Sequence, residues 1–256
     1  MNSTYKYKII IFLAAILASF ISCKKNNGTT TGSSINNTNT TNSGPITGYL
    51  IATRQCEINT LTNSLFTAGN TGVAYFFSSP NNISSYVSVG SVWVGQTKFS
   101  YQNYIITYSD TTQMLSINPT TWRVVGANAI PSFTYTNNDS LPTYTGFASL
   151  PDTIYKLQNL SLQINGVSGA NLVEVILNDG TSVSSGHLIT QYTASVSTNN
   201  TIIIPASSMA GFTPFASTHY PGSIELNFQK FNDQVISGKT YRFISQLQVS
   251  TNVYIK

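Results

Sequence analysis

Alternation of apolar and polar residues limits what this chain can fold into more than any other feature. It is clearest in residues 160–164, 173–177, 224–228 and 241–249, where alternate residues are mostly apolar. Because successive side chains of a strand point to opposite faces, this pattern predicts strands with one buried face. Turn-forming residues follow such segments at Asn178-Asp179-Gly180 and Ser237-Gly238-Lys239. Apart from one helical turn at residues 206–212, we find no helical pattern, so we expect an all-β chain with antiparallel strands.

The first half of the chain has shorter predicted strands, at residues 49–53, 73–77 and 86–94 among others. In the last of these, Val87, Val89 and Trp93 would share one face of the strand. Tyrosine-rich residues 99–108 alternate less cleanly, which suits a half-buried pleated surface.

A proline-rich stretch separates the two halves. Three prolines punctuate residues 127–152, and proline fixes φ and removes a hydrogen-bond donor from a strand ladder. We therefore expect a loop-like connection there. The sequence predicts two antiparallel β-sandwich domains, residues 47–128 and residues 129–256.

The N-terminus is typical of an export signal. Lys6 and Lys8 precede an apolar run, residues 9–21, which Ser22 separates from Cys23. A positive start, an apolar core of about a dozen residues and a small residue before the cleavage point define a secretory signal. The core is short for a membrane span, which takes about 20 residues.

A cysteine directly after the cleavage point indicates a lipid anchor. Phe20-Ile21-Ser22-Cys23 resembles a bacterial lipobox, which implies diacylglycerol on the Cys23 sulfur. Residues 1–22 would then be a lipoprotein signal peptide. Residues 23–46, rich in Asn, Thr, Ser and Gly, would be a flexible tether, because they cannot bury enough surface to offset their ordering entropy. An ordinary signal peptide or an N-terminal anchor helix are the alternatives.

The low charge of the chain excludes one class of partner. Only 8% of residues are charged, against about 25% in typical soluble domains. The formal charge is +4, and two of these charges leave with the signal peptide. The longest basic run is Lys24-Lys25, so we expect no nucleic-acid partner and only weak attraction of this pair to anionic lipid.

Residues for metal binding or nucleophilic catalysis are scarce. The histidines are His187 and His219, which we expect in surface loops, and neither a triad nor a metal motif surrounds them. With Cys23 lipidated, Cys56 has no partner for a disulfide and is expected to be a small buried hydrophobe. The sequence thus predicts no metal, no cofactor and no catalytic function.

Two carboxylates leave an enzymatic alternative open. Glu174 and Glu225 lie on predicted strands of the second domain and alternate with apolar residues, which would direct them outward. A glycosidase needs two carboxylates about 5–9.5 Å apart. Exposed carboxylates are usually a solvated surface, so a small carbohydrate-active hydrolase is the less favoured reading.

Five tyrosines are the candidate binding residues. They concentrate near the end of the first domain and in the connection: Tyr101, Tyr104, Tyr108, Tyr135 and Tyr144. Tyrosine combines a flat apolar ring with a hydroxyl and is common in adaptable recognition surfaces. The simpler interpretation is that these rings fill cross-strand positions of a sheet with few charges.

The mature chain resembles lipoproteins of Bacteroidota that carry immunoglobulin-like β-sandwiches behind a polar tether. The resemblance rests on Ser22-Cys23, the runs at residues 122–126 and 130–135, Leu150-Pro151-Asp152 and residues 237–243. It implies two immunoglobulin-like domains anchored to the outer membrane. In that group, acidic residues after the lipidated cysteine are associated with surface export, whereas this chain has Lys24-Lys25. We therefore favour the periplasmic face over the cell surface.

The same resemblance implies O-glycosylation at Asp-[Ser/Thr]-[aliphatic or Thr] triplets. Such triplets would place glycans on Thr111, Ser140 and Thr153. Chance occurrence is the alternative in a chain so rich in Ser and Thr.

Taken alone, the sequence favours a non-catalytic, lipid-anchored cell-envelope protein that serves as a binding, adhesion or scaffold module. Its partners would be the membrane, through the N-terminal lipid, and a glycan or an envelope protein. A hydrolase and a purely structural envelope component are the alternatives, because fold-level analogy does not fix function.

Overall fold

The computed structural model describes residues 45–59, 62, 64–102, 107–110, 112–180, 189–196, 200–216 and 221–256. Within them the helices are short: η1 (Ile83–Ser85), η2 (Gly146–Ser149) and α2 (Ala206–Met209). The predicted all-β fold is confirmed, and α2 lies where the sequence predicts one helical turn. None of the described helices has the length and apolar character needed to cross a membrane. The predicted signal peptide, Cys23 with its predicted lipid, and nearly all of the predicted tether lie outside the described residues.

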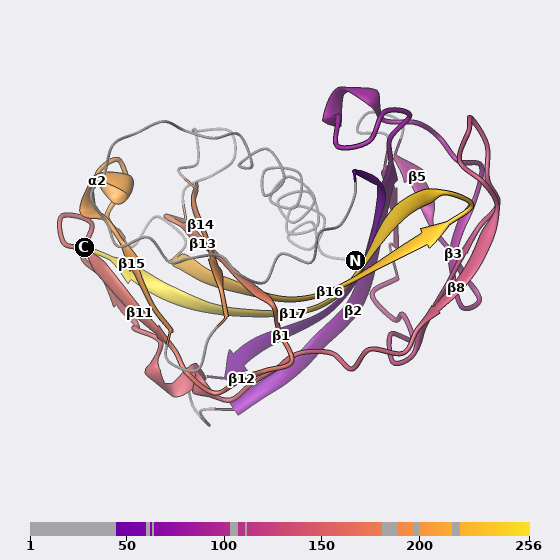
Figure 1. The fold of residues 1–256 in the computed structure, drawn as a ribbon. Coiled ribbons are helices and arrows are strands. Elements are labelled where there is room, and N and C mark those ends of the chain that lie inside the picture. Colours follow the sequence, from indigo (N-terminus) through magenta and orange to yellow (C-terminus); the bar gives the residue numbers. More distant parts are fainter. Residues whose placement is uncertain are drawn as a thin grey trace. The chain divides into compact units, whose positions relative to one another are not determined.

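A nine-stranded sheet, here the long sheet, extends through the described chain (Figure 1). Its order is β14-β13-β16-β17-β1-β2-β6-β5, and β10 pairs with the end of β17. The bounds are β1 (Ile46–Asn59), β2 (Ser64–Phe76), β5 (Ser100–Gln102), β6 (Thr107–Ser109), β10 (Thr153–Ile154), β13 (Leu172–Asn178), β14 (Ile189–Ser195), β16 (Gly222–Ile236) and β17 (Lys239–Ile255).

Three smaller sheets accompany the long sheet. One has four strands in the order β4-β3-β7-β8, and the others are the pairs β11-β15 and β12-β9. The bounds are β3 (Val92–Val94), β4 (Thr97–Lys98), β7 (Thr120–Val124), β8 (Phe133–Asn137), β9 (Thr143–Tyr144), β11 (Leu160–Ile164), β12 (Val167–Ser168) and β15 (Asn200–Ile204).

The central strands of the long sheet come from the two ends of the described chain. β16 and β17 form an antiparallel hairpin whose turn residues, Ser237 and Gly238, have φ values of 51° and 75°. Positive φ at both positions is typical of a two-residue hairpin turn, which the sequence predicts at this place. β1 then pairs in parallel with β17, from Ile46 opposite Thr240 to Glu57 opposite Ser250. Nearly the whole described chain therefore separates two neighbouring strands.

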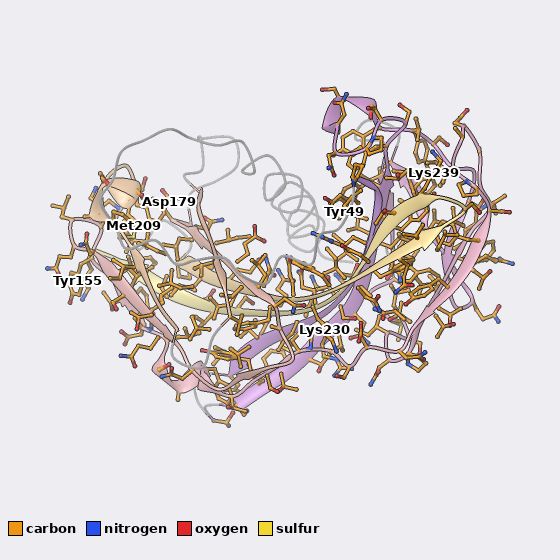
Figure 2. All side chains as sticks on the ribbon, viewed as in Figure 1. Tyr49, Tyr155, Asp179, Met209, Lys230 and Lys239 are labelled. Carbon is orange, nitrogen blue, oxygen red and sulfur yellow. The ribbon has the colours of Figure 1, made fainter. Side chains whose placement is uncertain are left out.

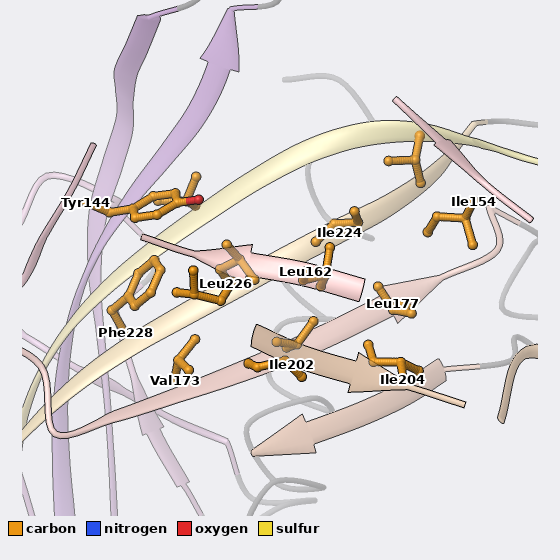
Figure 3. Close-up of a cluster of buried hydrophobic side chains, with 14 of the residues drawn as sticks. Tyr144, Ile154, Leu162, Val173, Leu177, Ile202, Ile204, Ile224, Leu226 and Phe228 are labelled. Carbon is orange, nitrogen blue, oxygen red and sulfur yellow. The ribbon is translucent and has the colours of Figure 1, made fainter. Parts of the chain in front are cut away.

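Two hydrophobic clusters form between the long sheet and the smaller sheets. The Trp122 cluster, under β4-β3-β7-β8, includes Leu50, Phe76, Val92, Trp122, Phe133 and Phe243. The Phe228 cluster, under β11-β15, includes Cys56, Leu162, Val175, Ile204, Phe228 and Val249 (Figure 3). The face that the alternation predicts to be buried is buried in β11, β13, β16 and β17. In β13 and in the middle of β16 and β17 the other face is buried as well, so the prediction of one buried face is wrong there.

The predicted division at residues 128 and 129 does not follow this architecture. It falls inside the hairpin formed by β7 and β8, in which Val124 pairs with Phe133. The proline-rich stretch, predicted to be a loop, contains β8 and β9. β1 and β17 each contribute to both clusters, and residues 42–256 group as one compact unit. Each cluster is the core between two packed sheets, and the long sheet is one of the two sheets in both cases.

Shared strands predict that the two clusters unfold together. Leu226→Ala, in the Phe228 cluster, should cost about 2–5 kcal/mol of unfolding free energy because it leaves a cavity. Both tryptophans, Trp93 and Trp122, lie in the four-stranded sheet, so their fluorescence reports on the other cluster. We expect Leu226→Ala to lower the midpoint of the tryptophan transition in urea.

Val235→Ala is the matched control, because Val235 lies on the same strand and is 72% exposed. It should leave the midpoint nearly unchanged. If Leu226→Ala leaves the midpoint of the tryptophan transition unchanged, the two clusters instead belong to independent domains.

Candidate functional site

A row of outward-facing residues crosses the four-stranded sheet. Trp93 on β3 pairs with Lys98 on β4 and with Arg123 on β7, and Arg123 pairs with Thr134 on β8. The residues on either side of Trp93 and Arg123 in their strands all belong to the Trp122 cluster. Alternation therefore directs these four side chains, here called the cation–indole row, away from the core.

Both cross-strand neighbours of Trp93 are cations, Lys98 on β4 and Arg123 on β7. The Arg123 Cζ atom lies 4.5 Å from the Trp93 ring centre, and the Lys98 Nζ atom lies 5.8 Å from it. A cation within about 6 Å of an aromatic ring is attracted by the negative potential of its face. The ring thus restricts both long side chains to positions above the sheet.

No carboxylate neutralises these cations within the described chain. Strands β3, β4, β7 and β8 contain neither Asp nor Glu, and among the described residues Lys98 and Arg123 form no ion pair. By contrast, Lys230 pairs with Asp139 at 2.9 Å, and Arg242 pairs with Asp233 at 2.7 Å. The row is therefore a local concentration of positive charge.

A shallow hollow of ≈ 460 Å³ opens beside the row. It is lined by Ser91, Trp93, Arg123, Val124, Val125, Ser132, Phe133 and Thr134. Two of these residues are aromatic, one is an arginine, two are valines and three carry a hydroxyl group. A few polar groups around apolar surface are the usual composition of a small-ligand site.

The tyrosines proposed from the sequence do not form one surface. Tyr108 and Tyr144 are 1% and 3% exposed, so their assignment as binding residues is corrected: they fill the two clusters. Burial raises the pKa of Tyr144 to about 12. Tyr135 is half-buried against Phe243, with 4.2 Å between the ring centres. Tyr101 is 38% exposed on β5, and Tyr104 lies outside the described residues.

The sequence interpretation missed the cation–indole row for a specific reason. It places Trp93 on the same face as Val89 in one long strand, but the strand begins only at Val92. Gly90, with a φ of 78°, turns the backbone first, so Val92 enters the core and Trp93 faces outward. The signal for Arg123 was present, because it stands between two inward-facing residues of β7.

The structure brings Glu174 and Glu225 together on the opposite face of the long sheet from the Phe228 cluster. The Asn227 Nδ2 atom donates to Glu225 Oε1 at 2.9 Å and to Glu174 Oε2 at 3.3 Å. Because both hydrogen bonds start at one nitrogen atom, the distance between Glu225 Oε1 and Glu174 Oε2 cannot exceed the sum of their two lengths. The prediction of two solvated carboxylates is wrong for Glu174, which is 2% exposed, while Glu225 is partly exposed.

Side-chain amides connect this carboxylate pair across the sheet. Because a carboxylate can only accept, Asn227 must donate to it and leave its own oxygen to accept from Gln246 at 3.1 Å. Gln246 in turn accepts from Gln229 at 3.1 Å. A second branch runs from Gln55 through Gln248 to Glu225. In this network of Asn and Gln side chains, here called the amide ladder, each of these hydrogen bonds is donated in the direction of the carboxylates.

The other predicted site residues are not gathered into a site. Ser140 is exposed, Thr153 is half-buried in β10, and Thr111, His187 and His219 lie outside the described residues. Cys56 is 6% exposed in the Phe228 cluster, which confirms its prediction as a buried hydrophobe, and burial raises the pKa of its thiol. The described residues contain no cluster of three or more His, Cys, Asp or Glu that could hold a metal ion.

The carboxylate pair predicts a pH-dependent stability. Desolvation raises the pKa of Glu225 above 4.5, although hydrogen bonds from Asn227 and Gln248 oppose the shift. The folded state then binds the proton more tightly than the unfolded state, so this contribution to stability is lost as the pH rises through the raised pKa. We expect Glu225→Gln to gain melting temperature relative to the native chain as the pH rises from about 4 to about 7.

The gain should be measurable, since about 1 kcal/mol shifts Tm by about 2–4 °C in a chain of this size. Differential scanning calorimetry across this pH range measures it. Asp152→Asn, which removes an exposed carboxylate, should show a smaller change with pH. Parallel curves for Glu225→Gln and the native chain would contradict the assignment.

Comparison of the chain with protein-family models, with curated proteins and with solved structures found no match.

Proposed function

We propose that this protein is a non-catalytic binding module of the bacterial cell envelope, and that it holds a polysaccharide on the outward face of β4-β3-β7-β8. The observation that carries the proposal is the cation–indole row beside a hollow lined with hydroxyl groups. A sugar presents hydroxyl groups at its rim and C–H groups on its faces. The hollow offers Ser91, Ser132 and Thr134 to the first, and Trp93 and Val125 to the second.

The N-terminus supports placing this module on a membrane. In the proposal, Cys23 carries the lipid, and residues 23–46 tether the folded unit to the outer membrane, with the periplasmic face favoured by Lys24-Lys25. The likeness to Bacteroidota lipoproteins belongs to the same proposal. So does the description as two immunoglobulin-like sandwiches, for which the support is that each cluster lies between the long sheet and a smaller sheet.

Trp93→Ala tests the binding surface. The full chain should be retarded in native gels that contain a recognised polysaccharide, screened from a panel of neutral and acidic ones. We expect Trp93→Ala to weaken binding roughly tenfold, which corresponds to about 1.4 kcal/mol of lost contact. Tyr101→Ala is the control, because Tyr101 is a partly exposed aromatic residue on a strand of the long sheet.

Two results would contradict this binding surface. One is the absence of retardation by every polysaccharide in the panel. The other is a loss of retardation in Tyr101→Ala with none in Trp93→Ala. Thermal melts of both variants show whether a loss of binding is only a loss of folding.

Cys23→Ser tests the anchor. Without the thiol that receives diacylglycerol, we expect the protein to move from the membrane pellet to the soluble fraction of lysed cells. Protease added to intact and to permeabilised cells then distinguishes the two faces of the outer membrane. Membrane association that survives Cys23→Ser would show that a different segment anchors the chain.

One observation favours a second function. Glu174 and Glu225 share a donor in Asn227, which brings them to the short end of the separation that a glycosidase needs. A hydrolase would release new reducing ends from the polysaccharide that it binds, and Glu225→Gln would stop the release. The amide ladder is the reason to prefer binding, because it already occupies the carboxylates with hydrogen bonds from the protein's own side chains.

A further inference from the structure

Two cations share one aromatic ring on the outward face of β4-β3-β7-β8. The Arg123 Cζ and Lys98 Nζ atoms lie 4.5 Å and 5.8 Å from the centre of the Trp93 ring, so they are no farther apart than these two distances together. At this upper limit, which is about the Debye length of 0.1 M salt (about 10 Å), salt screens much of the repulsion between the two charges. The indole offsets part of this repulsion, but its quadrupole carries no net negative charge.

The remaining positive potential has no internal partner. The other pairs of this fold show what a neutralised cation looks like: Arg242 has two charge-assisted bonds to Asp233, at 2.7 Å and 2.8 Å. Lys98 and Arg123 form no such bond among the described residues, and their four strands contribute no carboxylate. Lys98 and Arg123 are therefore exposed cations that an anionic group of a ligand can approach without displacing an ion pair.

We infer that the polysaccharide held by this surface is an acidic one, whose carboxylate or sulfate groups bind Lys98 and Arg123. The inference rests on the proposed function and adds the ligand class to it. Arg123 offers a planar set of donors suited to a carboxylate or sulfate, and it lies against Trp93, with its Cζ atom 4.5 Å from the ring centre. Lys98, on the other side of the ring, supplies a point charge for an anionic group one sugar or more along the chain.

The rest of the surface favours a sugar over an anionic lipid. The residues that line the hollow next to Arg123 include Ser91, Ser132 and Thr134, and Thr121 on β7 and Thr136 on β8 form a hydroxyl pair at 3.0 Å. Hydroxyl groups recognise hydroxyl-rich ligands by hydrogen bonds, whereas a lipid surface calls for a larger apolar area. Sugar rings that carry acidic groups can contact both the hollow and the two cations.

The test uses probes that differ only in charge. The full chain is titrated with polygalacturonate and with its fully methyl-esterified form, and with dextran sulfate and with plain dextran. We expect binding to at least one charged form and at least about tenfold weaker binding to its neutral partner, which is about 1.4 kcal/mol. Binding to the charged form should weaken several-fold between about 0.05 M and about 0.5 M NaCl because salt screens exposed charges.

Two lysines provide a matched pair of variants. Lys98 and Lys256 are both exposed, and each lies over an aromatic ring, at 5.8 Å from Trp93 and 6.0 Å from Tyr155. Figure 2 shows Tyr155 at the opposite end of the long sheet from Lys239, whose turn packs near the Trp122 cluster. Lys98→Ala should weaken binding to the charged probe about three- to tenfold, whereas Lys256→Ala, which removes the same charge, should not.

Each other result overturns the inference in a recognisable way. Equal binding to the charged and neutral members of a pair, still lost in Trp93→Ala, refutes the acidic ligand but leaves the proposed function standing. No binding to any probe or to the wider panel of polysaccharides refutes both. Equal losses in Lys98→Ala and Lys256→Ala indicate unspecific charge attraction. Capture by phosphatidylglycerol vesicles that depends on Lys98, without binding to either charged polysaccharide, assigns the surface to lipid.

Discussion

The parallel pairing of β1 with β17 is the constraint on which the rest of the structure depends. It brings the first and last described strands together along most of their length. Because β17 supplies Phe243 to the Trp122 cluster and Val249 to the Phe228 cluster, each cluster is built on the same strand. Neither hydrophobic cluster can be complete until β17 has paired with β1. Such non-local pairing has a high loop-closure cost, which the burial in both clusters must offset.

Local patterns were enough to predict the apolar face of the main strands, but not which polar side chains are buried or which strands are neighbours. Alternation identified Leu162, Val175 and Phe228 as core residues, because a strand buries one face whatever its partner is. The turn at Ser237 and Gly238 was also predictable from local sequence, because turn-forming residues occur there. The pairing of β1 with β17 has no local signature, so a proline-rich stretch was taken for a domain boundary although it contributes β8 to a hairpin.

The candidate site shows the same division between local and non-local information. Its three main residues, Trp93, Lys98 and Arg123, come from three strands, and only the register of the four-stranded sheet aligns them. The tyrosines were attractive from composition alone, yet two of them fill the clusters, because a ring with one hydroxyl is as useful in a core as on a surface. Glu174 and Glu225 lie 51 residues apart in sequence, and the pairing of β13 with β16 makes them diagonal neighbours.

The exposed cation–indole row and the largely buried amide ladder differ in what they leave for a ligand. In the amide ladder, each side-chain amide from Gln229 to Asn227 donates to the next group, and the chain of hydrogen bonds ends on carboxylates. A satisfied network of this kind fixes the structure and has little left to offer. In the cation–indole row, Trp93 restrains two cations without neutralising them. Charge that is positioned but not neutralised is available to a ligand, which is why the proposed function places binding at the row and not at the ladder.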